Sequence, residues 1–282
     1  MKKTLQELDL SNSFLFAAAL EDPEICQLVL EIILGSKVPK VKVHAEHSIL
    51  ISSEFRSVRL DIYASDELQV NYNVEAQNEN EGNLAKRSRY HQAEMDVSSL
   101  KPGDDFNDLK PGYVIFICTF DPFGEGLYRY TFEERCLERN IKLGDETRKI
   151  FLNTKGKNEK EVPKELIHFL KYVENSTDDY VSGIKDDSIE RLHEKVTALK
   201  RWRGLEAKYM TFEELLKRRE SKGIAEAVLT LLEVYGTVPE DVRERILSER
   251  HLEVLKDWTK LAAQVDSVEE FVSKMQEESA QI

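Results

Sequence analysis

Apolar and polar side chains alternate along two segments of the sequence, Val58-Arg59-Leu60-Asp61-Ile62-Tyr63 and Val70-Asn71-Tyr72-Asn73-Val74-Glu75-Ala76-Gln77. Alternation with a period of two predicts β-strands that bury one face of a sheet and leave the other face more polar. The polar stretch from Ser65 to Glu67 lies between them and predicts a turn. We therefore expect both segments to lie in one sheet, with the rest of the chain arranged around it.

The segments on either side show further helix and strand patterns. Residues 24–34 have apolar side chains at spacings of three and four, between Asp22-Pro23 and Gly35, which predicts a capped helix. Further strands are expected at 41–43, 49–51, 113–120 and 149–152. A helix is expected over 84–100, with an apolar stripe of Leu84, Tyr90, Ala93 and Val97. This order of helix, three strands, helix and strand predicts an α/β protein.

The second half of the chain has a different character. From about Pro163 onward no strand pattern remains, and helical stretches are expected over 162–173 and 188–222. The apolar spacing between Asp241 and Met275 predicts several shorter helices. We therefore expect a first domain over residues 1–187 and a helical C-terminal region over residues 188–282.

The composition excludes several classes of protein. The 282 residues include 53 Asp and Glu against 40 Lys and Arg, a net charge of −13, and 41% are hydrophobic. This hydrophobic fraction excludes a disordered chain, and the negative charge argues against a protein that coats nucleic acid through a general positive field. No apolar run approaches the ~20 residues of a membrane-spanning helix. Three cysteines without a CxxC pair favour a reducing compartment, so we expect a cytoplasmic protein with no membrane partner.

Asp61 and Glu75 form the candidate chemical site. In an antiparallel hairpin two residues face each other when their numbers add to a constant, here 61 + 75 = 136, which centres the turn on residue 68. Two adjacent carboxylates repel each other unless a cation lies between them. The pair therefore predicts a site for a hard divalent ion, with the Ala76 carbonyl as a third oxygen ligand. The alternative is that both are ordinary acids on the polar side of a sheet.

Several segments, taken in order, resemble the PD-(D/E)XK nuclease superfamily and, within it, the transposase-like Rpn group of recombination-promoting nucleases. The matching segments are Arg59-Leu60-Asp61-Ile62-Tyr63, Tyr72-Asn73-Val74-Glu75-Ala76-Gln77, Arg87-Ser88-Arg89-Tyr90-His91-Gln92, 114–124, 130–133 and 150–156. The resemblance covers roughly residues 9–220. It implies an α/β fold with a restriction-endonuclease-like αβββαβ core and a mixed sheet, followed by an all-helical C-terminal region.

The resemblance also implies roles for individual residues. Asp61 and Glu75 would be catalytic acids that bind metal, with Mg²⁺ as the expected ion and Mn²⁺ or Ca²⁺ as alternatives. Gln77 stands where the superfamily has lysine, and its amide can orient the attacking water but brings no charge. By position, Glu31 is the first-helix acid that completes the metal shell, with an ordinary surface glutamate as the alternative.

The helix expected after the second strand would lie across the catalytic strand. Arg89 and Gln92 are three residues apart, so one helix face can present a guanidinium and an amide toward the carboxylates. In a nuclease Arg89 would contact the scissile phosphate and Gln92 would help to hold it. In the alternative, Arg89 only neutralises an acid in a structural ion pair. His91 is expected to be an ordinary surface histidine, with a general base as the alternative.

Two functional hypotheses follow from these residues and from the resemblance. The first is a metal-dependent DNA endonuclease that acts in DNA recombination, mobile-element movement or phage defence. The second is a catalytically weak or inactive nuclease-fold protein. Gln77 in place of lysine and the net negative charge of the chain motivate this hypothesis. Such a protein would act as a binding or regulatory module, with its helical C-terminal region contacting a partner or forming a homodimer.

Overall fold

The structure, a computed structural model, describes residues 3–44 and 62–279. Within these ranges six strands form one sheet in the order β1-β2-β3-β4-β6-β5. The strands are β1 (Val41–Val43), β2 (Ile62–Asp66), β3 (Asn71–Gln77), β4 (Gly112–Cys118), β5 (Arg129–Phe132) and β6 (Thr147–Asn153). The β1–β2, β2–β3 and β5–β6 pairs are antiparallel, and the β3–β4 and β4–β6 pairs are parallel. The predicted mixed sheet is confirmed.

The described helices precede the sheet, join its strands and then follow it. They are α1 (Ser13–Leu20), α2 (Pro23–Leu34), α3 (Leu84–Ser99), α4 (Lys164–Glu174), α5 (Asp178–Ile184), α6 (Asp187–Lys200), α7 (Arg203–Leu232), α8 (Glu240–Ser248), α9 (Leu252–Ala262) and α10 (Val268–Ser279). No helix in the described part of the chain is long and apolar enough to cross a membrane.

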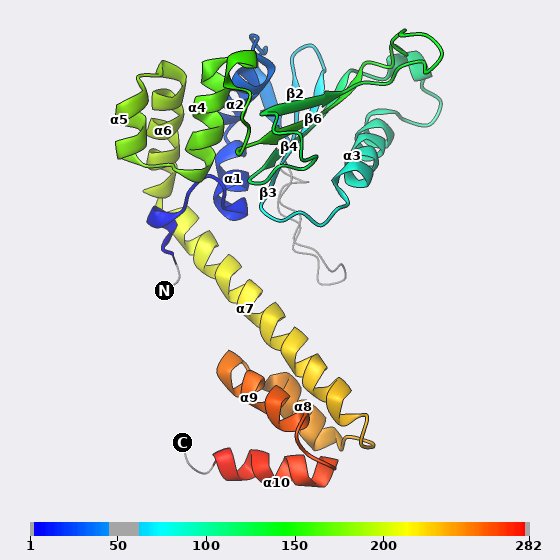
Figure 1. The fold of residues 1–282 in the computed structure, drawn as a ribbon, viewed down its shortest axis with the longest axis vertical. Helices are drawn as coiled ribbons and strands as arrows, with labels where there is room; N and C mark the ends of the chain where they lie inside the picture. Colours follow the sequence, from blue (N-terminus) through cyan, green and yellow to red (C-terminus); the bar gives the residue numbers. More distant parts are fainter. Residues whose placement is uncertain (1–2, 45–61, 280–282) are drawn as a thin grey trace. The chain divides into compact units, whose positions relative to one another are not determined.

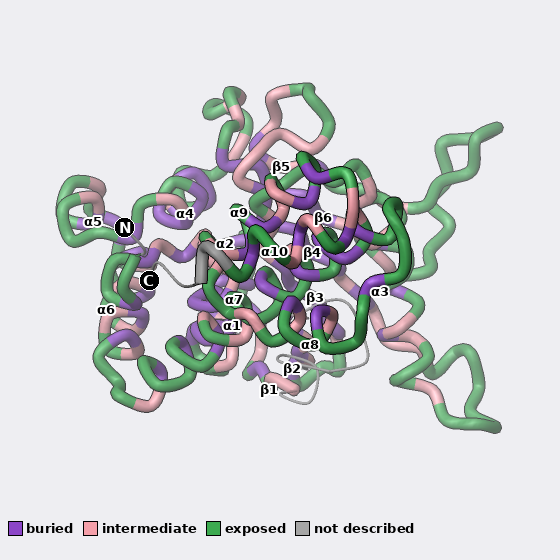
Figure 2. The backbone as a smooth tube through the Cα atoms, turned by 90° about the horizontal axis from the view of Figure 1, so that it is seen from below, coloured by how far each residue is buried: buried purple, intermediate pink, exposed green. Residues whose placement is uncertain are grey.

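Different helices cover the two faces of the sheet. The face that carries Tyr72 and Val74 packs against α1 and α2 (Figure 1). The other face carries Glu75 and Gln77 and lies against α3, which contacts β3 and β4. Because successive side chains of a strand point to opposite faces, β3 gives one apolar face to the core and one polar face to α3. Buried residues run along the central strands β4 and β6 and also along helices α1, α2 and α4 (Figure 2).

Helix α2 confirms the helix predicted over 24–34, and its ends follow from its sequence. The Asp22 side chain accepts hydrogen bonds from Glu24 N at 2.8 Å and Ile25 N at 3.1 Å, which satisfies two of the free N–H groups of the first turn. Gly35 has φ 67°, the left-handed conformation that commonly ends a helix. The cap and the terminator therefore lie where the sequence predicts them.

Three elements differ from the sequence-based expectations. Helix α1 was not expected, and neither was β5 at the edge of the sheet. The apolar stripe expected on α3 is confirmed at Leu84 and wrong at Tyr90, Ala93 and Val97, which are exposed. The residues that α3 buries are Leu84, Ser88, His91, Gln92 and Met95. The strand expected at 49–51 lies outside the described residues, as does the first part of the one expected from Val58.

The chain divides into two units, Met1–Leu205 and Glu206–Ile282. The second unit is helical, as predicted, and its core includes Trp258 from α9 and Phe271 from α10. The division falls later than the sequence-based boundary between 187 and 188, because α6 packs against α2 and α4 of the first unit.

Candidate active site

The pairing of β2 with β3 has the register expected from the sequence. Ile62 pairs with Val74 and Tyr63 with Asn73, and the residue numbers of both pairs add to 136. The turn between the strands is closed by the Asp66 side chain, which accepts hydrogen bonds from two backbone N–H groups of the turn. Asp61, the predicted first acid, lies outside the described residues.

Glu75 is a buried carboxylate on the sheet face that α3 covers. Its Oε1 accepts a hydrogen bond from Gln77 Nε2 at 2.6 Å and an ion-pair contact from the Arg87 guanidinium. Arg87 also donates from its other terminal nitrogen to Gln77 Oε1 at 3.1 Å. Three side chains, two from β3 and one from α3, therefore form a closed polar ring around one carboxylate oxygen.

The second oxygen of the same carboxylate is differently placed. Glu75 Oε2 is buried and accepts no hydrogen bond from any residue that the structure describes. It lies 3.5 Å from His91 Nε2. A buried carboxylate oxygen without a hydrogen bond is costly to a protein, so this atom has capacity for an added ligand.

The expectation of a surface histidine at position 91 is wrong. His91 is buried on the inner side of α3, with its ring centroid 6.1 Å from that of Phe116. Its Nδ1 lies 3.3 Å from Glu94 Oε2. Together with the contact to Glu75, this makes His91 a member of the site.

The floor of the site is aromatic. The Arg87 guanidinium lies over Phe116, with 5.8 Å from Cζ to the ring centroid. Phe116 stacks on Phe151 of β6, with ring centroids 5.3 Å apart and planes 9° from parallel. Because these rings exclude water from one side, the attraction between Arg87 and Glu75 is stronger than it would be in bulk solvent.

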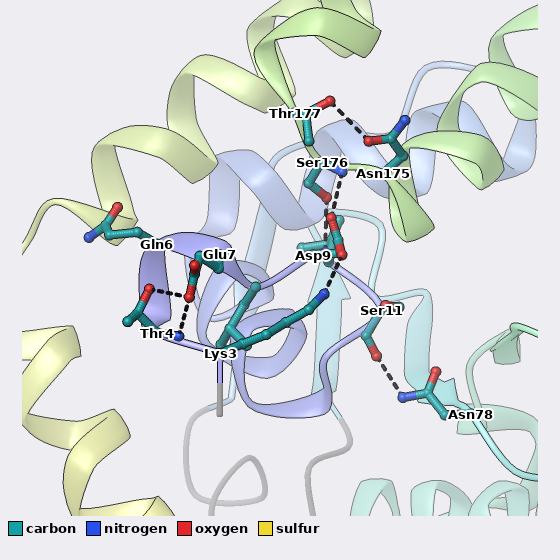
Figure 3. Close-up of polar contacts among 12 residues, drawn as sticks. Lys3, Thr4, Gln6, Glu7, Asp9, Ser11, Asn78, Asn175, Ser176 and Thr177 are labelled. Carbon is teal, nitrogen blue, oxygen red and sulfur yellow. Dashed lines mark hydrogen bonds and ion pairs between the residues drawn. The ribbon is translucent and has the colours of Figure 1, made fainter. Parts of the chain in front are cut away.

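The end of β3 is anchored to the segment before α1 (Figure 3). Asn78, directly after the strand, donates from Nδ2 to Ser11 O at 2.7 Å. Two residues earlier in that segment, Asp9 Oδ1 accepts from Ser176 N at 3.0 Å. The first contact ties the end of β3 to the segment before α1, and the second ties that segment to the connection between α4 and α5.

The remaining predicted residues are not gathered around Glu75. Arg89 is exposed on α3. The guanidinium that faces the Glu75 carboxylate belongs to Arg87. Gln92 is buried, but its Nε2 donates to Asp96 Oδ1 at 3.0 Å. Burial raises the pKa of Asp96, and the nearby charge of Asp145 adds to this effect.

Glu31 has a local structural role. Its carboxylate accepts hydrogen bonds from Lys37 Nζ at 3.2 Å and from Val38 N at 3.2 Å. Burial raises the pKa of Glu31, but these hydrogen bonds outweigh it and leave the pKa below its ordinary value. Helix α2 packs on the sheet face opposite Glu75. Arg129 pairs with Leu152, which shares the face of Ala76, and from that face Arg129 donates to Ile33 O at the end of α2. The structure therefore does not bring Glu31 to the site.

In the described part of the chain, Glu75 supplies one oxygen donor of the kind that a hard divalent cation binds. Within residues 3–44 and 62–279, no three His, Cys, Asp or Glu side chains are grouped so that they could hold a metal. The described part nevertheless offers a buried carboxylate oxygen with open capacity, and oxygen is the ligand atom that such ions prefer. Ala76 lies between Glu75 and Gln77 on β3, and the role of its carbonyl as a ligand stays a prediction.

One comparison with known proteins finds a match. No curated protein and no solved structure matches the chain significantly. The family model described as PD-(D/E)XK nuclease family transposase matches residues 8–227, which include the whole sheet, α3 and the polar ring around Glu75. The chain therefore belongs to the PD-(D/E)XK nuclease family transposases.

Proposed function

We propose that the protein is a divalent-metal-dependent DNA endonuclease. The observation that carries this proposal is the buried Glu75 carboxylate, with one oxygen in the ring with Gln77 and Arg87 and the other without a hydrogen bond. Family membership supports hydrolysis of phosphodiester bonds as the reaction class. Cleavage within a strand, dependence on Mg²⁺ and DNA as substrate belong to the proposal.

Glu75 and Asp61 would hold the cation, with the Ala76 carbonyl as a further oxygen donor. Asp61 directly precedes Ile62, the first residue of β2, whose pairing with β3 supports this choice. A bound divalent cation would supply Lewis acidity toward the phosphate and make water a better nucleophile. Mg²⁺ is the expected ion, with Mn²⁺ or Ca²⁺ as alternatives.

The reaction is a simple exchange at phosphorus. A water oxygen forms a bond to phosphorus, and the bond from phosphorus to the leaving sugar oxygen breaks. One proton passes from the water to solvent, and the leaving oxygen takes up a proton. Gln77 uses one amide N–H for Glu75, and we assign its second N–H to orienting the water. Arg89, exposed on α3, is proposed to contact the DNA backbone, while Gln92 would support that helix from its inner side.

Plasmid cleavage in Mg²⁺ tests the proposal directly. Substitutions D61N and E75Q are expected to lower the cleavage rate by about 10²-fold or more, the scale of removing one transition-state electrostatic group. The matched control is E79Q, because Glu79 is an exposed acid four residues after Glu75. Cleavage that survives in both D61N and E75Q would show that these acids are not the site.

A binding module without cleavage is the second candidate. Occupation of Glu75 Oε1 by Gln77 and Arg87 favours it, because only one carboxylate oxygen is left open. The discriminating measurement is the unfolding temperature in millimolar Mg²⁺ or Mn²⁺, since a ligand that binds the folded state raises it. A wild-type protein that binds DNA, does not cleave it and shows no such rise supports the binding module.

The biological setting is also proposed. We infer a cytoplasmic protein that acts in DNA recombination, mobile-element movement or phage defence, and that forms a homodimer through its C-terminal helices. Sedimentation of the full chain with and without residues 206–282 tests the last point. An unchanged mass per particle would argue against a dimer formed by these helices.

A further inference from the structure

The site needs a positive charge that position 77 does not supply. Negative charge develops on the phosphate oxygens during hydrolysis, and fixed positive groups aimed at it contribute strongly to catalysis. Gln77 is neutral. Within the described part of the chain, Arg87 is the permanently charged cation in contact with Glu75.

Arg87 is built to bind a phosphate as well as a carboxylate. One terminal nitrogen contacts Glu75 and the other donates to Gln77 Oε1 at 3.1 Å, so the planar fork is held in a fixed plane above Phe116. A guanidinium in such a position binds phosphate with two parallel hydrogen bonds. The Arg87 side chain is 30% exposed, compared with 12% for Glu75, so a ligand can reach it from solvent.

Arg87 and a divalent cation compete for the same carboxylate. Both are positive, and each is stabilised by the single negative charge of Glu75. A cation at Glu75 therefore weakens the hold of the carboxylate on Arg87 and repels the guanidinium. The guanidinium then needs a new anion, and the phosphate of a bound substrate is the anion that the reaction brings.

We propose that Arg87 is a catalytic residue that neutralises Glu75 in the metal-free protein and passes to the scissile phosphate when a divalent cation binds. This inference rests on the proposed nuclease function. It assigns to α3 the charge that β3 lacks at Gln77. It also makes Arg87 a competitor of the metal for Glu75, whereas a purely structural ion pair would support the metal site by holding Glu75 in place.

The sign of the effect on metal affinity separates the two roles. If Arg87 only holds the site together, its removal disorders Glu75 and weakens metal binding. If Arg87 competes with the metal, its removal strengthens metal binding while it slows cleavage. The experiment therefore measures Mn²⁺ affinity by calorimetry on the full chain without DNA, and plasmid cleavage in Mn²⁺ separately.

The variants are R87M and R87K. R89M, at an exposed arginine two residues along the same helix, is the matched control for the Mn²⁺ calorimetry alone, because Arg89 is proposed to contact DNA. R87M is expected to bind Mn²⁺ about tenfold more tightly, because a competing charge next to the carboxylate is gone. Its cleavage rate is expected to fall by about 10²- to 10³-fold. R87K keeps a charge but loses the fork, so its cleavage rate lies between those of R87M and the wild type. R89M binds Mn²⁺ like the wild type.

Two results would overturn the inference while the proposed function stands. One is weaker or unchanged Mn²⁺ binding by R87M, and the other is cleavage by R87M at the wild-type rate. If R87M does not fold, R87K decides: weaker Mn²⁺ binding than the wild type overturns the competition. Mn²⁺ binding by E75Q equal to that of the wild type would instead overturn the cation site itself, and with it both proposals.

Discussion

Gly156 lies so close to Tyr128 that any side chain there must displace the backbone. A Cβ added to Gly156 would be 2.3 Å from Tyr128 Cγ, 2.6 Å from Cδ1 and 2.7 Å from Cα. The ring could rotate away, but the Cα atom could not. Tyr128 is fixed by two backbone hydrogen bonds, because its N–H donates to Asn158 Oδ1 at 2.8 Å and its carbonyl accepts from Asn153 N at 3.0 Å. Substitution of Gly156 by alanine therefore strains the junction of two loops.

The size of the effect follows from these distances. Non-bonded carbon atoms normally lie about 3.5–4.0 Å apart, so all three contacts are too short by roughly 1 Å. Overpacking of this kind costs about 1–3 kcal/mol, and we expect the upper end because the backbone of Tyr128 has to move. At about 2–4 °C per kcal/mol for a unit of this size, G156A should lower the unfolding temperature by roughly 6–12 °C.

Scanning calorimetry measures the unfolding temperature of G156A. The transition of the Met1–Leu205 unit is followed separately from that of the helical unit. The matched control is G183A in α5, where an added Cβ meets no atom within 4 Å. Alanine is the better helix former, so G183A should gain about 0.5–1 kcal/mol. A G156A protein that unfolds within ~1 °C of the wild type would refute the reasoning, because the loops would then yield without cost.

Three further predictions concern the site and its surroundings. Although burial raises the pKa of Asp121, hydrogen bonds from Tyr130 and from three loop N–H groups hold it below its ordinary value. D121N should therefore lose about 1–2 kcal/mol at neutral pH. Thermal unfolding should show this difference shrinking as the pH falls below about 4, because the unfolded chain then takes up a proton at Asp121 that the folded protein takes up only at lower pH. On an R87M background, Q77K should recover cleavage by about tenfold, since it returns a positive charge beside Glu75; plasmid assays with no recovery would argue against a missing charge at Gln77. E31Q should cleave plasmid at the wild-type rate, and a large loss would restore Glu31 to the metal shell.

The sequence predicts the register of the central hairpin because two constraints act together. Alternation fixes which side chains of β3 share a face, and the short connection to β2 leaves little freedom in pairing. The observed pairs then follow from the position of the turn at Asp66 to Val70. The ends of α2 were predictable for a similar reason, since Asp22 and Gly35 act within a single turn of helix.

Helix α1 and strand β5 lack such local signals. Helix α1 buries seven of its eight residues, Phe14 to Leu20, so it has no polar side from which a period could be recognised. Strand β5 is four residues long, and Thr131 and Phe132 are exposed. Only the pairing with β6 makes it a strand, and a pairing between distant segments cannot be deduced from one short stretch.

The phase of α3 explains why Arg87, and not Arg89, lies against Glu75. Each helical residue turns by about 100°, so two residues that are two positions apart point about 160° away from each other. The expected apolar stripe included Tyr90 and Val97, which are 61% and 78% exposed. The buried stripe runs instead through Leu84, Ser88, His91, Gln92 and Met95 and includes three polar side chains.

The spacing of apolar residues cannot identify that stripe, because a helix that covers a chemical site buries polar side chains that the site uses. The spacing that could have found it is polar: Arg87 precedes His91 by four residues, so both lie on one side of α3. Glu75, the buried acid of β3, contacts the Arg87 guanidinium, and its Oε2 lies 3.5 Å from His91 Nε2. The better sequence rule for such a helix is therefore to seek the face on which cationic and imidazole side chains recur at spacings of three or four, opposite the acids of the neighbouring strand.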